Sequence, residues 1–148
     1  MKLKLDHIGY IVKDLKNSIR YFENLYNFKA LTKIIYEKAH NVRLGFIDLG
    51  LNTMPALELI EPINKLSKVY NFLKNNGEGL HHLAYQVDNI ENITKKFKEK
   101  GFIQISEIVP GAGHNKTKTI WLLGKKRELI ELIQKQKGKS KSKRFTKS

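Results

Sequence analysis

The sequence repeats itself, because residues 6–28 resemble residues 81–103 at an offset of 75. Identical side chains recur at matched positions, among them His7 and His82, Tyr10 and Tyr85, and Phe22 and Phe97. A repeat of this kind indicates one supersecondary unit used twice. Each copy alone would leave an apolar face open, and pairing the two copies in one chain covers it.

Each copy of the repeat predicts a strand followed by a helix. Side chains alternate in period two along residues 7–12, which places His7 on the strand face opposite Tyr10. Apolar residues at helical spacing follow. We expect the helices to begin near Asp14 and Asp88, whose carboxylates can cap the first turn.

The later part of each half also matches, and predicts two strands joined by a hairpin. Turn residues at 52–55 and 125–127 separate the strands within each half. The matched segments are FIDLG (46–50) with IWLLG (120–124), and LELIE (57–61) with IELIQ (130–134).

Together these elements predict an α+β fold. Extended stretches at residues 29–36 and 103–109 complete each half as βαβββ. We expect two paired βαβββ modules that form a curled mixed sheet around a metal-binding cleft. The predicted domain covers residues 1–134, with modules 1–63 and 79–134 and a linker, 64–78, that holds a short helix near 65–74.

The charge distribution sets the basic end of the chain apart from the rest. The net charge is +14, and residues 135–148 contribute six Lys and one Arg without an acid. Like-charge repulsion and low hydrophobicity predict a disordered tail there. Residues 1–134 show no stripe of interleaved basic and aromatic residues, so nucleic-acid binding is not expected.

Several other classes of protein are disfavoured by composition. The sequence contains no run of about 18 apolar residues, the length that a membrane span needs. Its N-terminus lacks the pattern of a signal peptide. The chain has no cysteine, so a metal site would use nitrogen and oxygen ligands. We therefore expect a cytoplasmic protein.

Four ligand-type side chains occupy matching places in the repeat. His7 and His82 begin the first strand of each half, and Glu58 and Glu131 lie in the last. Each Glu stands between two apolar residues and should point away from them. Taken alone, a strand His is more often structural and a strand Glu more often faces solvent. All four in register predict one divalent ion, with Zn, Co, Ni, Mn and Fe as candidates.

The motifs that carry these residues resemble the vicinal oxygen chelate superfamily. They are LDHIGYIVKDL, NGEGLHHLAYQVDNIE, the PGAG turn at 110–113 and the closing LIELI, and the resemblance spans residues 5–134. The superfamily includes glyoxalase I, extradiol dioxygenases and bleomycin-resistance proteins, and the sequence is most similar to its methylmalonyl-CoA epimerase family. The resemblance implies metal ligation by His7, Glu58, His82 and Glu131, with Glu131 also acting as a catalytic acid/base.

The resemblance is incomplete at the second acid/base of that family, a glutamate shortly before the third strand. Here Glu37 lies one residue too far upstream, Ala39 occupies the aligned place, and His40 is a candidate substitute. The alternative for His40 is an exposed loop residue without a role. His81, next to His82, is interpreted as a supporting or structural residue.

These observations predict a divalent-metal-dependent epimerase or isomerase that removes a proton next to a carbonyl. The substrate would be a small molecule, such as an acyl-CoA or another acyl thioester, and the resemblance implies a homodimer. The alternatives are a lyase of the glyoxalase I type and a non-catalytic, resistance-type binding protein.

Overall fold

The computed structural model describes residues 2–50, 55–111 and 117–135. The chain divides into two compact units, with boundaries between Asp6 and His7 and between His81 and His82. We call residues 7–81 the N-terminal unit, and residues 82–135 with 2–6 the C-terminal unit. Most of the predicted turn at 52–55, part of the PGAG turn and nearly all of the basic tail lie outside the described residues.

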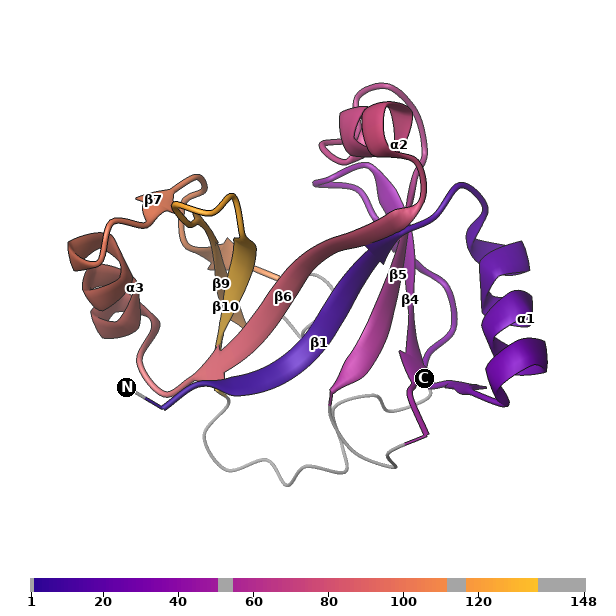
Figure 1. Ribbon diagram of the computed structural model, residues 1–148, viewed down its shortest axis with the longest axis horizontal. Coiled ribbons are helices and arrows are strands. Elements are labelled where there is room, and N and C mark those ends of the chain that lie inside the picture. Colours follow the sequence, from indigo (N-terminus) through magenta and orange to yellow (C-terminus); the bar gives the residue numbers. More distant parts are fainter. Residues whose placement is uncertain (1, 51–54, 112–116, 136–148) are drawn as a thin grey trace. The chain divides into compact units, whose positions relative to one another are not determined.

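The N-terminal unit contains one complete βαβββ module (Figure 1). Its first strand pairs in parallel with β5, and β5 pairs antiparallel with β4. The predicted second strand, residues 29–36, is broken into β2 and β3, which both pair antiparallel with β4. The elements are β1 (Lys4–Ile11), α1 (Leu15–Tyr26), β2 (Lys29–Ala30), β3 (Ile35–Glu37), β4 (Val42–Asp48), β5 (Ala56–Pro62) and a short helix α2 (Tyr70–Asn76).

The C-terminal unit repeats this topology. Its last strand, β10, pairs in parallel with β6 and antiparallel with β9, while β7 and β8 both pair with β9. The elements are β6 (Gly79–Val87), α3 (Ile90–Glu99), β7 (Ile103–Gln104), β8 (Val109–Pro110), β9 (Lys118–Leu123) and β10 (Leu129–Gln134). The predicted α+β fold of two βαβββ modules is confirmed. Its curl around a cleft stays a prediction.

Side-chain caps begin both long helices. Asp14 accepts a hydrogen bond from the Asn17 amide at 2.9 Å, as predicted. In the second module the cap is Asn89, which accepts from the Asn92 amide at 2.7 Å, so the prediction of Asp88 was wrong by one residue. The offset of 75 places Asn89, not Asp88, at the position of Asp14.

The short helix α2 begins later than the sequence pattern predicts. It starts at Tyr70 rather than near Lys65. The Asn64 side chain accepts a hydrogen bond from the Leu66 amide at 2.9 Å, which favours a turn over a helix there. Gly77, with a φ of 74°, ends the helix in a conformation that side chains other than glycine rarely adopt.

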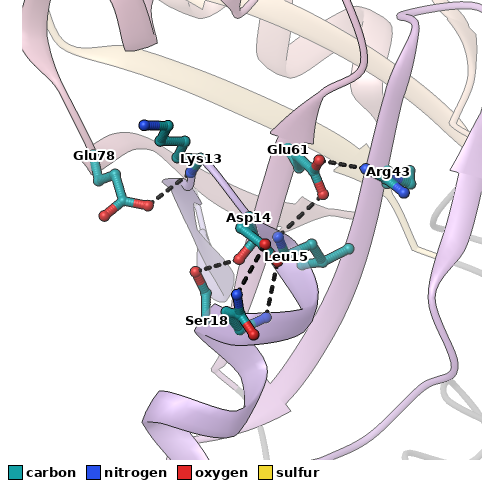
Figure 2. A network of polar contacts seen from close by, with 8 residues as sticks. Lys13, Asp14, Leu15, Ser18, Arg43, Glu61 and Glu78 are labelled. Carbon is teal, nitrogen blue, oxygen red and sulfur yellow. Dashed lines mark hydrogen bonds and ion pairs between the residues drawn. The ribbon is translucent and has the colours of Figure 1, made fainter.

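The last strand of each module also caps the helix of that module. Glu61, at the end of β5, accepts a hydrogen bond from the Leu15 amide at 3.0 Å and forms an ion pair with Arg43 (Figure 2). Gln134, at the end of β10, accepts one from the Ile90 amide at 2.8 Å. Each bond satisfies an amide that a helix leaves without an internal partner, so strand and helix are tied at matching places.

Each unit has its own apolar core. In the N-terminal unit, α1 packs beside β4 and β5 through a cluster with Val12, Leu15, Ile47, Leu57 and Leu59 (Figure 1). The opposite sheet face holds Ile11, Val42, Leu44, Phe46, Ala56 and Ile60, with Phe72 and Leu73 from α2. In the C-terminal unit α3 packs on Ile120, Leu122, Ile130 and Leu132. Among the described residues, none of the helices is long and apolar enough to cross a membrane.

The cap from Glu61 predicts a loss of stability on its removal. We expect Glu61→Ala to lower the free energy of unfolding by about 1–3 kcal/mol, because the buried Leu15 amide loses its acceptor. Glu61→Gln should remain close to the parent protein, since an amide oxygen performs this task at Gln134. Urea denaturation followed by circular dichroism measures both variants. Equal midpoints for Glu61→Ala and the parent would contradict the cap.

Candidate metal centre

In the N-terminal unit, His7 and Glu58 form a buried pair. The Nε2 atom of His7 lies 3.1 Å from Oε2 of Glu58. His7 is fully buried, and Glu58 is 6% exposed. The parallel register places Gly9 opposite Glu58 on the neighbouring strand. Because His7 and Gly9 are two positions apart, both belong to the face that carries Glu58.

The face that carries this pair is largely apolar. Leu57 and Leu59 belong to the core beneath α1, so Glu58 points to the opposite side of β5, as predicted. There it shares the face with Phe46, its antiparallel partner, and with Ile60. Burying a carboxylate among apolar side chains costs free energy unless a charge or ligand compensates it.

The separation of the two side chains suits coordination of one ion. Two ligand atoms that each lie about 2.1 Å from a cation, at a right angle, are about 3 Å apart. The distance from Nε2 of His7 to Oε2 of Glu58, 3.1 Å, matches this value. Imidazole nitrogen and carboxylate oxygen are donors that borderline divalent ions accept.

In the C-terminal unit, His82 and Glu131 lie on one face of the sheet. Glu131 stands opposite Ala84 on β6 and opposite Trp121 on β9. His82 is two positions from Ala84 and therefore belongs to the same face. Both ligand-type side chains are buried, His82 at 4% and Glu131 at 5% exposure.

Each of the two histidines also contacts an aromatic ring edge to face. The ring centroids of His7 and Phe46 are 5.6 Å apart at 81°, and those of His82 and Trp121 are 4.6 Å apart at 75°. Both aromatic residues stand opposite the glutamate of their module. Contacts of this kind hold an imidazole in one orientation through packing.

The sequence comparison of the two halves missed this aromatic pair. It matched Phe46 with Ile120, whereas the strand register makes Trp121 the counterpart of Phe46. A shift of one residue turns a side chain to the other face of a sheet. The match was wrong because the second hairpin is shorter, with Leu123 already paired to Leu129. The glutamate of each module is the signal that could have located both rings, because Phe46 pairs with Glu58 and Trp121 pairs with Glu131.

The donor set that the two units offer is chemically suited to a divalent ion. His7, Glu58 and His82 are all buried, and this His/Glu/His set is consistent with a divalent metal site. The role of Glu131 as a fourth ligand stays a prediction.

The other candidate residues occupy different surroundings. Oε1 of Glu37 lies 2.7 Å from Nδ1 of His40, and the Glu37 side chain is only 11% exposed. His40 is therefore half-buried and paired rather than an exposed loop residue. The ring of His81 lies edge to face with Phe72 of α2 at 4.9 Å, which fits the predicted structural role.

Comparison with known proteins identifies one superfamily to which this chain is similar. Residues 6–119 match the family model of the glyoxalase/bleomycin resistance protein/dioxygenase superfamily. The chain is 30% identical over 114 residues to the mitochondrial methylmalonyl-CoA epimerase of Homo sapiens, an alignment that covers 76% of this chain. It covers 62% of the human protein, so the match spans less than two thirds of that relative.

Solved structures share the fold over nearly the whole chain. A hypothetical protein from Bacillus halodurans C-125 superposes with a TM-score of 0.83 at 29% identity, covering 95% of this chain and 99% of the other. A variant of Streptomyces coelicolor methylmalonyl-CoA epimerase, in complex with 2-nitronate-propionyl-CoA, has a TM-score of 0.78 at 24% identity. That alignment covers 90% of this chain and 98% of the epimerase. At this identity it shows the fold alone.

The ligand geometry of the N-terminal unit predicts a specific loss of metal. We expect elemental analysis of protein purified without a histidine tag to find close to one divalent ion per chain. Removing a ligand should weaken binding by at least about tenfold, since even changes in residues that orient ligands cost 10–100-fold. Glu58→Ala should therefore be largely metal-free.

The same strand provides a matched control for this prediction. Glu61 lies on β5 on the face opposite Glu58 and caps α1. Glu61→Gln should keep the metal content of the parent. Full metal content in Glu58→Ala, with an unchanged circular dichroism spectrum, would show that Glu58 is not a ligand.

Proposed function

The chain belongs to the glyoxalase/bleomycin resistance/dioxygenase superfamily, and on that basis we propose that it is a divalent-metal-dependent epimerase or isomerase. Its reaction would remove a proton next to a carbonyl, as in methylmalonyl-CoA epimerase. The observation that carries the proposal is the buried pair of His7 and Glu58 with ligand atoms 3.1 Å apart. His82 and Glu131 repeat the same residue types at equivalent register positions.

We assign one divalent ion to His7, Glu58, His82 and Glu131. All four are buried, and imidazole nitrogen and carboxylate oxygen are donors that borderline divalent ions accept. Two nitrogen and two oxygen donors would leave coordination positions for a substrate on a six-coordinate ion. Zn, Co, Ni, Mn and Fe all accept such a donor set.

The proposed chemistry divides between the ion and the protein. A bound divalent ion supplies a Lewis acid that stabilises the negative charge of an enolate oxygen. Glu131 is the proposed base, and its carboxylate would take the proton from the carbon next to the carbonyl. His7 and His82 would hold the ligand geometry, each oriented by an aromatic neighbour. A substrate fixed by two oxygens would present its acidic C–H in one orientation.

The proposed substrate class is an acyl-CoA or a related acyl thioester. A similar human protein is a methylmalonyl-CoA epimerase, and a structure of the Streptomyces coelicolor enzyme contains 2-nitronate-propionyl-CoA. A thioester carbonyl acidifies the adjacent C–H and provides an oxygen for the ion, which matches the proposed chemistry. The proposal also includes a homodimer, a cytoplasmic location and a single domain over residues 1–134 with a basic tail.

The donor set favours catalysis over simple sequestration. A resistance-type binding protein needs only a shaped cavity, which apolar side chains can line. Here both modules bury a histidine and a glutamate, at a free-energy cost that binding of an apolar ligand would not require.

The proposed activity predicts exchange of one substrate proton. Metal-loaded protein in D₂O should replace the proton at C2 of methylmalonyl-CoA with deuterium, which proton NMR detects as loss of coupling to the methyl group. Glu131→Gln cannot accept the proton and should exchange it at least about 100-fold more slowly.

Two controls make this measurement specific. Glu61→Gln retains every proposed ligand and should exchange at the rate of the parent protein. If the parent exchanges no faster than Glu131→Gln, methylmalonyl-CoA is not the substrate, whatever the metal content.

A further inference from the structure

The C-terminal unit contains a cavity between α3 and the segment that follows this helix. Thr94, Lys95 and Lys98 line it from α3, and Gln104 and Ile108 line it from the other side. Its volume is about 340 Å³, within the range of small-molecule sites. Because α3 packs on the sheet face that carries Ile120 and Leu132, the cavity lies on the side of the sheet opposite Glu131. It is therefore separate from the candidate metal centre.

A buried hydroxyl group at this cavity has no hydrogen-bond partner. Thr94 is 6% exposed, and its Oγ1 forms no hydrogen bond within the described part of the chain. A threonine inside a helix can donate to the carbonyl four residues earlier, and a buried hydroxyl that makes no bond destabilises the fold. Threonine has two favoured χ1 rotamers in a helix, so rotation can bring Oγ1 toward a ligand. A bound ligand would supply the missing partner.

The internal repeat shows that the βαβββ fold does not need this hydroxyl. At the offset of 75, Thr94 corresponds to Ile19 of α1, which packs against the apolar cluster beneath that helix. A Cβ atom added to Gly45 would lie 3.4 Å from Cδ1 of Ile19. The strand register makes Ile120 the counterpart of Gly45, so the larger strand residue accounts for a smaller helix residue. Valine would meet that requirement without a polar atom, so packing explains the size of Thr94 and not its hydroxyl.

The other groups at the cavity determine which ligand it suits. The side-chain nitrogen of Gln104 donates a hydrogen bond to the Ser106 carbonyl at 2.9 Å, so the side-chain oxygen is the atom that can accept a bond from a ligand. Ile108 packs against the core of this unit and provides an apolar wall. A ligand that matches both sides therefore has a hydrogen-bond donor on an apolar body.

The charged residues around the cavity favour an anion. Glu91 and Glu99 also line it, but Nζ of Lys118 lies 2.7 Å from Oε1 of Glu91 and compensates the charge of that carboxylate. Lys95 and Lys98 form no ion pair with any residue that the structure describes. Two ammonium groups thus stand against the one remaining carboxylate of Glu99, and a ligand carboxylate would compensate the excess positive charge.

We propose that this cavity is a second binding site, for a small carboxylate that carries a hydroxyl group on an apolar body. The ligand carboxylate would meet the ammonium groups of Lys95 and Lys98. Its hydroxyl would pair with Oγ1 of Thr94 and donate to the Gln104 oxygen, and its apolar part would pack on Ile108. The site binds without chemistry, and it does not depend on the proposed metal-dependent reaction.

The test titrates the full chain with 2-hydroxyisocaproate, which has all three groups, and follows the backbone amides by ¹H–¹⁵N NMR. We expect saturable shifts of the Thr94, Lys95 and Gln104 amides with a Kd of about 1 mM or lower, which a ligand of about nine non-hydrogen atoms can reach. Isocaproate lacks the hydroxyl, and 2-hydroxyisocaproamide lacks the charge. Each should bind at least about tenfold more weakly.

Thr94→Val removes the hydroxyl and retains the shape of the side chain. It should bind 2-hydroxyisocaproate at least about tenfold more weakly. Its midpoint of urea denaturation should equal or exceed that of the parent protein, because a buried hydroxyl without a partner is removed. A lower midpoint would mean that the hydroxyl stabilises the fold, and would contradict its assignment to a ligand.

Variants of two lysines on α3 test the contribution of charge. Lys98→Gln should weaken binding of 2-hydroxyisocaproate and leave binding of the uncharged amide unchanged. Lys96 lies on the same helix and is not among the residues that line the cavity. Lys96→Gln removes the same charge and is the matched control, so it should bind the carboxylate as the parent protein does.

Three results would overturn the proposed site. The first is the absence of saturable shifts at Thr94 and Gln104, and the second is parental affinity in Thr94→Val. The third is a set of shifts confined to the other sheet face, at Ala84 and Trp121, which would mean that the hydroxy acid chelates an ion at the candidate metal centre. None of these measurements uses metal content or proton exchange, so the site and the proposed function can fail separately.

Discussion

The parallel pairing of the first and last strands in each module is the constraint on which the proposed site depends. It places Gly9 opposite Glu58 in one unit and Ala84 opposite Glu131 in the other. In both modules the histidine lies two positions before the small residue, and therefore on the face of the glutamate. A slip of one residue would turn each glutamate toward the core beneath the helix, where a carboxylate has no compensating partner. At the end of the same last strand, Glu61 and Gln134 each cap the helix N-terminus of their module.

The small residues opposite the glutamates also determine the space beside them. A larger side chain at Gly9 or Ala84 would project from the same face next to the carboxylate, because directly opposed residues lie about 5 Å apart. The aromatic rings on the other side, Phe46 and Trp121, fill the opposite flank of each glutamate and contact the histidines. Each module thus places an aromatic ring on one side of its glutamate and a residue with little or no side chain on the other. The ring also holds the histidine by packing.

The sequence was sufficient for the features that follow from periodicity and from the repeat. The βαβββ order, the cap at Asp14 and the direction of Glu58 depend on local patterns, and the structure confirms them. The predictions that were wrong have a common cause. They concern positions that are determined by strand pairing or by a turn that competes with a helix. The start of α2 shifted because the Asn64 turn competes with helix. The match of Phe46 with Ile120 was wrong because the two hairpins differ in length, which changes the residues that pair across them. A comparison of the strand segments alone does not contain this difference. Binding of one ion by four residues requires their side chains to approach one another in space, and residue types and spacing in the sequence do not determine that.

The repeat and the proposed reaction make opposite demands on symmetry. Ligands to one ion benefit from duplication, since two copies of a module supply two equivalent histidines and two equivalent glutamates. Inverting a carbon centre has no such equivalence, because the groups on its two sides must exchange roles as acid and base within one turnover. Two identical carboxylates in the same protonation state could not begin that cycle. One group must begin as a base and the other as an acid. The β3–β4 turn lies outside the parallel strand pairs that place Glu58 and Glu131, so its sequence can differ from its counterpart in the second module without shifting their register.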